Sequence, residues 1–429
     1  MELKVSKTKL LDGELDASPD KSITHRALLL ASIASQPSLI HGVSSCKDCL
    51  HTIAALKQLG VHFSFIKDKT VQVLPPKKWS TPSDPVFCGN SGTLMRLLTG
   101  LVAAQNGLEA TLAGDLSLSK RPMGRVITPL ERMGAKLKGS RPPLKIIGSN
   151  LKPIDYTSHL SSAQVKSCLM FAGLHAEGET CITQSYQTRD HTEKMLQFLD
   201  VPITEEKTSK GYQVKVRGKS HLSGFELGIP GDFSSAAFWA TLAAMNPASK
   251  LLIKNVGINP TRTGSLNVFS QAKIHWELIN ERKFGHEAVA DLYIQSKKDL
   301  EPFQVGPCEV PLMIDEIPIL AVLATQCKGI SSFTGLEELR FKESDRLQSI
   351  VMNLQKMGAC VETQKGGFLI SGPTQLKSAT IDSGGDHRIA MAFTIAGLVA
   401  TGETRIKDAN CISTSYPEFF TDLEKICTF

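Results

Sequence analysis

The sequence predicts an α/β fold built from six copies of one unit. Segments rich in β-branched residues alternate with helix-like segments, and the same order of segments returns roughly every seventy residues. The first helix of each copy is apolar nearly all round, which is typical of a helix buried inside a domain. Each copy therefore reads strand–helix–strand–helix–strand–strand, an α/β arrangement.

The first helices mark the copies. "SPDKSITHRALLLASIA" (18–34) opens the first copy, with Pro19 and Asp20 as helix-start signals before an apolar body. "GNSGTLMRLL" (89–98) opens the second. Comparable helix starts fall near Ser22, Ser91, Ser161, Ser234, Glu316 and His387.

The rest of each copy follows the same order. In the first copy a strand-like "SLIHGVSS" (38–45) leads to a helix, "CLHTIAALKQLGV" (49–61), which Gly60 ends. Short β-rich segments close the copies, among them "KTVQVLPP", "PLKIIGS", "GYQVKVRG", "ADLYIQS" and "GGFLISG". Six copies divide as three plus three, and the Gly and Pro of "ELGIPGDFSS" suggest a seam near residue 230.

Composition narrows the class of protein. The 429 residues carry 48 basic and 42 acidic side chains, a net charge of +6 that is too balanced for a general nucleic-acid binder. Ten scattered cysteines indicate reduced thiols, and the lone CxxC of Cys46 and Cys49 is interpreted as two free thiols rather than a metal or redox site. The N-terminus lacks signal-peptide and transit-peptide features, and no apolar run reaches about eighteen residues. We therefore expect a cytoplasmic protein without nucleic-acid or membrane partners.

Basic residues stand where helix electrostatics disfavours them. Lys21 and Arg26 crowd the first turn of the first helix, although a helix N-terminus already carries about half a positive charge. Further bases lie near other helix starts: Arg96, Arg121, Lys166 and Arg388. If these starts converge, the conflict is relieved when an anion lies among them, and the amides of "GNSGT" suit its close approach. The sequence thus predicts a small polyanion, phosphate or carboxylate, held in a cleft between two halves.

Acidic residues join the same positions. Asp315 and Glu316 open the fifth first helix, and "RFKESDRL" gathers Lys342, Glu343 and Arg346. Two interpretations remain open for this segment: an exposed turn with ordinary ion pairs, or a carboxylate tuned by neighbouring bases for proton transfer.

The chain resembles the EPSP synthase family from about Lys7 to Phe420. The resemblance rests on six motifs in order: "SPDKSITHRALLLASIA", "GNSGTLMRLL", "SKRPMGR", "SAQVKS", "RFKESDRL" and "GGDHRIAMAF". It implies transfer of the enolpyruvyl group of phosphoenolpyruvate to the 5-hydroxyl of shikimate 3-phosphate, with release of phosphate. It also implies two inside-out α/β domains of three repeats each, with the active site in the interdomain cleft. The N-terminal lobe, mainly the shikimate-phosphate side, spans 11–230, and 1–10 plus 231–429 form the C-terminal lobe.

The resemblance also implies site residues. Those for phosphoenolpyruvate are Lys21, Asn90, Gly92, Arg121, Gln164, Arg346 and Arg388, with Arg96 in support. Those for shikimate 3-phosphate are Lys21, Ser22, Arg26, Ser162, Ala163, Gln164, Arg189, Asp315 and Lys342. Asp315 is the implied base at the hydroxyl, and Glu343 the implied acid toward C3, with Lys21 a competitor for that role. No metal or organic cofactor is implied, glyphosate is the expected inhibitor, and we expect a monomer.

Three positions depart from the family pattern. Thr414 stands where members often have Lys, Ala163 where many have Ser, and Leu97 where a Pro is common. Two alternative functions predict different residues. UDP-N-acetylglucosamine enolpyruvyl transferase carries Cys or Asp in the loop that here reads "GDLSLSKRP", and a non-catalytic phosphometabolite-binding protein has no need of both Asp315 and Glu343.

Overall fold

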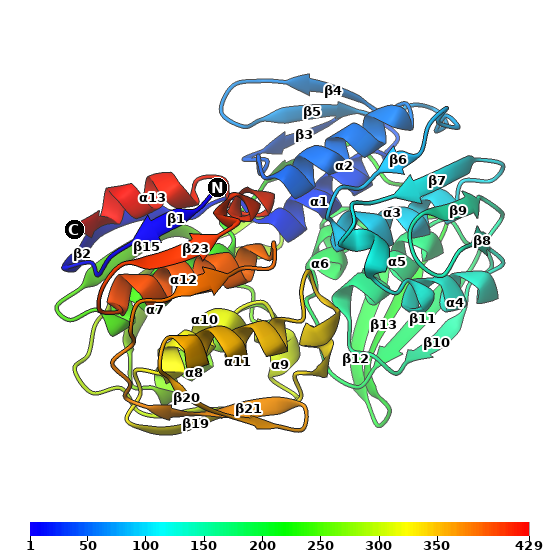
Figure 1. Cartoon of the computed structure of the whole chain (residues 1–429). Helices are drawn as coiled ribbons and strands as arrows, with labels where there is room; N and C mark the ends of the chain where they lie inside the picture. Colours follow the sequence, from blue (N-terminus) through cyan, green and yellow to red (C-terminus); the bar gives the residue numbers. More distant parts are fainter. Residues whose placement is uncertain (429) are drawn as a thin grey trace. The chain divides into compact units, whose positions relative to one another are not determined.

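The computed structural model describes residues 1–428, which form two compact units coloured along the chain in Figure 1. Unit 2 takes in Pro19–Ile229 and the short turn Phe284–Glu287. Unit 1 takes in Met1–Ser18, Pro230–Lys283 and the residues from Ala288 on.

Unit 2 contains three four-stranded sheets of one topology, β14-β3-β5-β4, β6-β7-β9-β8 and β10-β11-β13-β12. In each sheet the first two strands are parallel and the other two add antiparallel. The strands are β3 (Ser38–His41), β4 (His62–Phe65), β5 (Val71–Leu74), β6 (Val86–Phe87), β7 (Glu109–Ala113), β8 (Lys136–Lys138), β9 (Leu144–Ile147), β10 (Asp155–Ser158), β11 (Glu179–Gln184), β12 (Ile203–Thr208), β13 (Gly211–Arg217) and β14 (Glu226–Gly228). The helices are α1 (Lys21–Ala31), α2 (Lys47–Gln58), α3 (Gly92–Ala103), η1 (Leu118–Lys120), α4 (Gly124–Arg132), α5 (Ala163–Gly173) and α6 (His191–Phe198).

Unit 1 repeats this topology with more variation. Its sheets have the orders β16-β17-β15-β2-β24, β18-β19-β21-β20 and β1-β23-β22. The strands are β1 (Leu3–Val5), β2 (Leu10–Asp16), β15 (Lys250–Gly257), β16 (His275–Phe284), β17 (Glu287–Gln295), β18 (Gln304–Val305), β19 (Gly329–Phe333), β20 (Cys360–Gln364), β21 (Gly367–Gly372), β22 (Thr380–Asp382), β23 (Thr404–Lys407) and β24 (Cys427–Thr428). The helices are α7 (Phe233–Met245), α8 (Gly264–Gln271), α9 (Val310–Met313), α10 (Ile317–Ala324), η2 (Glu337–Phe341), α11 (Arg346–Lys356), α12 (His387–Val399), η3 (Ala409–Thr414) and α13 (Phe419–Ile426).

The α/β repeat prediction is confirmed, but some copies are not continuous in sequence. The first sheet takes its parallel edge strand from β14, at the far end of unit 2, rather than from the strand that precedes α1. That preceding strand, β2, pairs in parallel with β15 in unit 1. In unit 2, the last strand therefore supplies the parallel edge strand that the first copy lacks.

The first helix of each copy forms the core of its unit. In unit 2, α3 packs against both α1 and α5, and in unit 1, α7, α10 and α12 pack on one another. α3 and α5 approach so closely that a Cβ on Gly100 would lie 2.3 Å from the carbonyl oxygen of Cys168. These helices are buried on nearly every side, as the apolar sequence pattern predicts.

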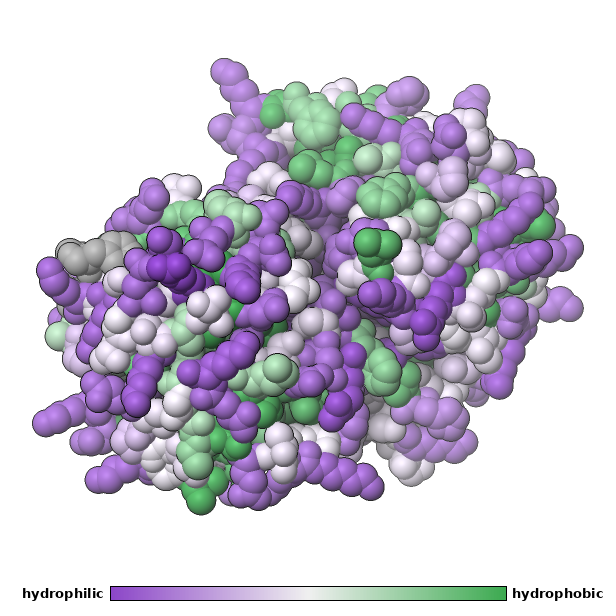
Figure 2. All heavy atoms as spheres, in the orientation of Figure 1, coloured by the Kyte–Doolittle hydropathy of each residue, from purple (hydrophilic) through white to green (hydrophobic). Residues whose placement is uncertain are grey.

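The face of the molecule drawn in Figure 2 is predominantly polar. On the face drawn in Figure 2, hydrophobic atoms occur in small groups separated by polar side chains. No helix among residues 1–428 is long and apolar enough to cross a membrane. Within the same residues no group of three or more His, Cys, Asp or Glu side chains is arranged to hold a metal ion. All ten cysteines are free, as expected.

Candidate active site

The first turn of α1 contains its own counter-charges. Asp20 caps the helix, and its carboxylate accepts the Ile23 N–H at 2.8 Å. Lys21 Nζ donates to Asp48 Oδ2 at 3.0 Å, and both side chains are almost buried. The charge conflict read from the sequence is therefore relieved in part by Asp48 on α2, a residue that the sequence argument missed.

Arg26 is directed into unit 2. Its Nε donates to Thr192 Oγ1 at 2.8 Å, and its Nη2 to Ser167 Oγ at 3.0 Å. Its Nη1 donates to the carbonyl oxygen of Ser22 at 2.9 Å. Arg26 is only 2% exposed, so its guanidinium orders the backbone that carries Lys21 and Ser22.

Two guanidinium groups lie beside Gly92, the first residue of α3. A Cβ placed on Gly92 would lie 3.0 Å from Arg96 Nη1 and 3.1 Å from Arg121 Nη1. Arg96 Nη1 also donates to Gln164 Oε1, while Gln164 Nε2 donates to Thr93 Oγ1 at 2.9 Å. Gly92 is thus the one side-chain-free position between two cations and the amide end of a helix, which suits close approach of an anion.

A short network orients Arg121. Its Nη2 donates to Asn90 Oδ1 at 2.7 Å and to Ser117 Oγ at 3.3 Å. Asn90 Nδ2 in turn donates to Asp115 Oδ2 at 2.6 Å. Asn90 and Arg121 are therefore brought together as predicted from the motifs, and Asp115 supports them without having been singled out in the sequence.

Lys166 does not join this group of bases. Its ammonium pairs with Glu193 and donates to the carbonyl oxygen of Thr188, with both charged side chains fully buried. Burial raises the pKa of Glu193 and the Lys166 charge opposes that rise. The inclusion of Lys166 among bases at an anion site was wrong, because spacing along a helix cannot show that a neighbouring acid is buried with it.

The remaining predicted residues of unit 2 lie near the start of α5 and before α6. Ser162 is the N-cap of α5 without a capping bond from its side chain, and Ala163 is the first helical residue. The carbonyl oxygen of Ser162 accepts from Gln184 Nε2 at 3.0 Å. Arg189 lies in the loop before α6 and is partly exposed.

A second charged group forms in unit 1 around Arg346. Its Nε donates to Asp386 Oδ2 at 2.8 Å and its Nη1 to Asp315 Oδ1 at 3.0 Å, while Nη2 pairs with Glu343. Although burial alone would lower the pKa of Arg346, the carboxylates of Asp386, Glu343 and Asp315 hold it above its ordinary value. The "RFKESDRL" segment therefore combines both features read from the sequence: Arg346 lies in a buried ion network, whereas Arg340 and Asp345 form a largely exposed ion pair at 3.2 Å.

Asp315 is shared by three cations. Besides Arg346, Lys342 Nζ lies 3.7 Å and Arg388 Nε 3.5 Å from its Oδ1. Asp386, which the sequence motifs did not single out, also orders the charged group around Arg346. It caps α12 by accepting the Arg388 N–H at 2.9 Å, and it accepts from Ser344 Oγ at 3.1 Å.

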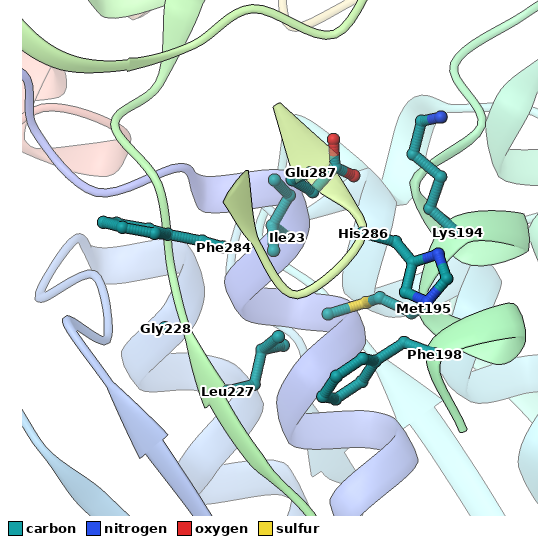
Figure 3. Close-up of a pocket in the computed structure, with 9 residues that line it drawn as sticks. All are labelled: Ile23, Lys194, Met195, Phe198, Leu227, Gly228, Phe284, His286 and Glu287. Atoms are coloured by element: carbon teal, nitrogen blue, oxygen red, sulfur yellow. The ribbon is translucent and has the colours of Figure 1, made fainter. Parts of the chain in front are cut away.

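A small apolar cavity in unit 2 lies apart from these charged groups. In Figure 3, Ile23, Met195, Phe198 and Leu227 surround it, and Glu287 lies near its rim. Glu287 is held by His191 Nδ1 at 2.6 Å. The cavity lies where the turn Phe284–Glu287 packs on α6. The groups there that could take part in acid–base chemistry lie at its rim.

Comparison with known proteins first defines the class. The structure is similar to the enolpyruvyl transferase NikO from Streptomyces tendae, with a TM-score of 0.79, 16% identity, and 99% of this chain and 97% of that chain covered. At that identity the likeness concerns the fold alone: the chain has the enolpyruvyl transferase fold.

Closer relatives define the family. A sequence model described as EPSP synthase (3-phosphoshikimate 1-carboxyvinyltransferase) matches residues 5–423. The 3-phosphoshikimate 1-carboxyvinyltransferase of Persephonella marina is 43% identical over 433 residues, with 99% of each chain covered. The EPSP synthase structure from Acinetobacter baumannii gives a TM-score of 0.86 at 35% identity, covering 99% of this chain and 98% of that chain. The chain belongs to the EPSP synthase family.

Proposed function

We propose that the charged groups of the two units together perform the reaction of this family. As a 3-phosphoshikimate 1-carboxyvinyltransferase, the chain transfers the enolpyruvyl group of phosphoenolpyruvate to shikimate 3-phosphate in the shikimate pathway. The observation that most directly supports the residue assignment is the pair of guanidiniums beside Gly92, because it leaves room for an anion where a side chain would otherwise stand.

Phosphoenolpyruvate takes the more strongly cationic positions. Arg121 and Arg346 offer planar forks that suit carboxylate and phosphate oxygens, and Gly92 offers the amides of a helix N-terminus. Asn90 orients Arg121, and Gln164 links α5 to α3. The donor-binding group comprises Lys21, Asn90, Gly92, Arg121, Gln164, Arg346 and Arg388.

Shikimate 3-phosphate takes positions at the starts of α1 and α5, so its binding falls mainly to the N-terminal lobe. The unused cap hydroxyl of Ser162 and the ordered first turn at Ser22 support this assignment. Arg26 contributes by ordering that turn. The acceptor-binding group comprises Lys21, Ser22, Arg26, Ser162, Ala163, Gln164, Arg189, Asp315 and Lys342.

The addition step requires two proton transfers. Asp315 takes the proton of the 5-hydroxyl as the oxygen adds to C2 of phosphoenolpyruvate, and Glu343 gives a proton to C3, with Lys21 the competing donor. Elimination of phosphate from the tetrahedral intermediate, together with loss of a proton from C3, then restores the double bond and forms the product. Both carboxylates pair with Arg346, which places them beside a cation assigned to the donor.

Phosphate release on mixing the two substrates tests the function. We expect release only when phosphoenolpyruvate and shikimate 3-phosphate are both present. Release with UDP-N-acetylglucosamine in place of shikimate 3-phosphate would instead indicate the sister enzyme. Tight binding of both substrates without release would indicate a non-catalytic binding protein.

Three finer points belong to the same proposal. Glyphosate inhibits by competing with phosphoenolpyruvate, which Gly92 supports because it leaves the donor position open. We propose that the protein acts as a monomer. It works in the cytoplasm, where its free cysteines stay reduced.

A further inference from the structure

A fully buried histidine, His25, bridges two helices of unit 2 behind the donor-binding residues. Its Nδ1 lies 2.6 Å from Thr52 Oγ1 on α2, and its Nε2 lies 3.4 Å from Ser91 Oγ. His25 and Thr52 are 0% exposed and Ser91 is 1% exposed, so water does not compete for these bonds.

The neighbouring bonds determine which ring nitrogen carries the proton. Thr52 Oγ1 donates its hydroxyl proton to the carbonyl oxygen of Asp48 at 3.3 Å, so toward the ring it accepts. His25 Nδ1 is then the protonated nitrogen, and the bare Nε2 accepts the hydroxyl proton of Ser91. Ser91 Oγ keeps its lone pairs for the Leu94 N–H, which it accepts at 3.1 Å.

This arrangement requires a neutral ring. Burial, followed by the charges of Lys21, Arg26 and His51, holds the pKa of His25 well below its ordinary value. A second ring proton would turn Nε2 into a donor and take away the acceptor that orients the Ser91 hydroxyl.

Ser91 matters because it is the N-cap of α3, whose first residue is Gly92. The Gly92 and Thr93 amides, in the first turn of α3, have no intrahelical acceptors. Gly92 itself lies beside Arg96 and Arg121, since a Cβ on it would approach a guanidinium nitrogen of each. A small rotation of Ser91 would therefore shift the amide end of α3 relative to both guanidiniums.

We propose that His25 is a positioning residue of the donor site: by fixing the Ser91 hydroxyl it holds the N-terminus of α3 in register with Arg96 and Arg121. The proposal rests on the proposed function for its assay. It assigns His25 an effect on phosphoenolpyruvate and none on shikimate 3-phosphate, although the ring lies one residue from Arg26 and on the same helix as Ser22.

Three variants test this. His25→Phe keeps the ring volume and removes both bonds, and we expect the Michaelis constant for phosphoenolpyruvate to rise about tenfold, the order of an N-cap loss. The Michaelis constant for shikimate 3-phosphate should change less than about twofold, and kcat should stay within about threefold. His25→Gln, whose longer amide reaches the Nε2 position and can accept from Ser91, should recover most of the donor affinity. Ser91→Ala should reproduce the His25→Phe effect, and the double variant should lose no more than Ser91→Ala alone.

The contrary outcomes are equally specific. Equal losses for both substrates, or losses that multiply in the double variant, would show that His25 merely supports the fold. Unchanged donor kinetics in His25→Phe would also overturn the proposal. If His25→Phe fails to fold, His25→Gln is compared with Ser91→Ala instead. Only Ser91→Ala should weaken the binding of phosphoenolpyruvate. A wild-type chain that releases no phosphate would instead refute the proposed function. Calorimetric titration with inorganic phosphate would then still compare wild type and Ser91→Ala at this site.

Discussion

At the scale of single residues, charged side chains of each unit are held by partners of opposite sign. Lys21 pairs with Asp48, and Arg346 with three carboxylates. Removing one member of a buried ion pair is costly, on the order of 3–5 kcal/mol, because the other charge is left unpaired. The anionic groups of the proposed substrates carry the same negative charge as these carboxylates and can therefore replace them beside the cations.

Neutralising either proposed proton-transfer residue should slow the chemistry. We expect Asp315→Asn and Glu343→Gln each to reduce kcat by about 10²–10⁴-fold, the usual range for a lost general acid or base. Substrate affinity should change by less than about tenfold, because the cations remain. Steady-state phosphate release measures both quantities. Glu337→Gln, at an exposed position of η2, is the matched control. Near-normal kcat in either test variant would remove that residue from the mechanism.

A methyl group at Gly92 should weaken the binding of both phosphoenolpyruvate and glyphosate. In Gly92→Ala the new Cβ meets two guanidinium nitrogens at 3.0 and 3.1 Å, so these side chains must shift. We expect the Michaelis constant for phosphoenolpyruvate to rise severalfold and inhibition by glyphosate to weaken further. Competition kinetics against phosphoenolpyruvate measure both. Gly124→Ala is the control, since nothing lies within 4 Å of its added Cβ. An inhibition constant equal to that of wild type would contradict the assignment of Gly92.

At the scale of elements, the N-termini of the first helices carry much of the proposed site. Their starts were predictable from the sequence, because an N-cap such as Asp20 or Ser91 precedes an apolar run. What α1 and α3 are packed against was not predictable. Asp48 and His25 act across helices, and Glu193 neutralises Lys166 from another element, so no local spacing reveals these pairs.

The segment after α5 should make unit 2 sensitive to acid. Burial, and then the charge of Lys219, lower the pKa of His175 to about 4. Because its unfolded pKa is about 6.5, the unfolded chain takes up this proton first as the pH falls. Stability is therefore lost from about pH 6.5 downward, by about 1–2 kcal/mol at pH 5 for this residue.

His175→Gln should reduce the loss of stability between pH 7.5 and pH 5. Denaturant unfolding at pH 7.5 and pH 5 measures the free energy of unfolding, and the difference between the two should be smaller in the variant than in wild type. Part of the loss should persist, because His25 also has a lowered pKa. His62→Gln, at an exposed position, serves as control. An identical pH dependence in His175→Gln and wild type would refute this explanation.

At the scale of the whole molecule, repetition made the fold predictable and long-range pairing limited the prediction. Each copy carries its own periodicity, so the sequence contains the α/β alternation six times. The parallel pairing of β2 with β15 and of β14 with β3 joins segments about two hundred residues apart, and local patterns do not encode such partners. The motifs likewise predicted most charged residues of the two groups, but not the carboxylates Asp48, Asp115 and Asp386 that order them.

The most direct test of the account is the crystal structure of the Glu343→Gln variant with both substrates bound, since slow turnover preserves the complex. The account predicts that the phosphate and carboxylate of phosphoenolpyruvate contact Arg121, Arg346 and the amide end at Gly92. Substrates bound elsewhere, with Arg121 still held only by its present protein partners, would contradict it.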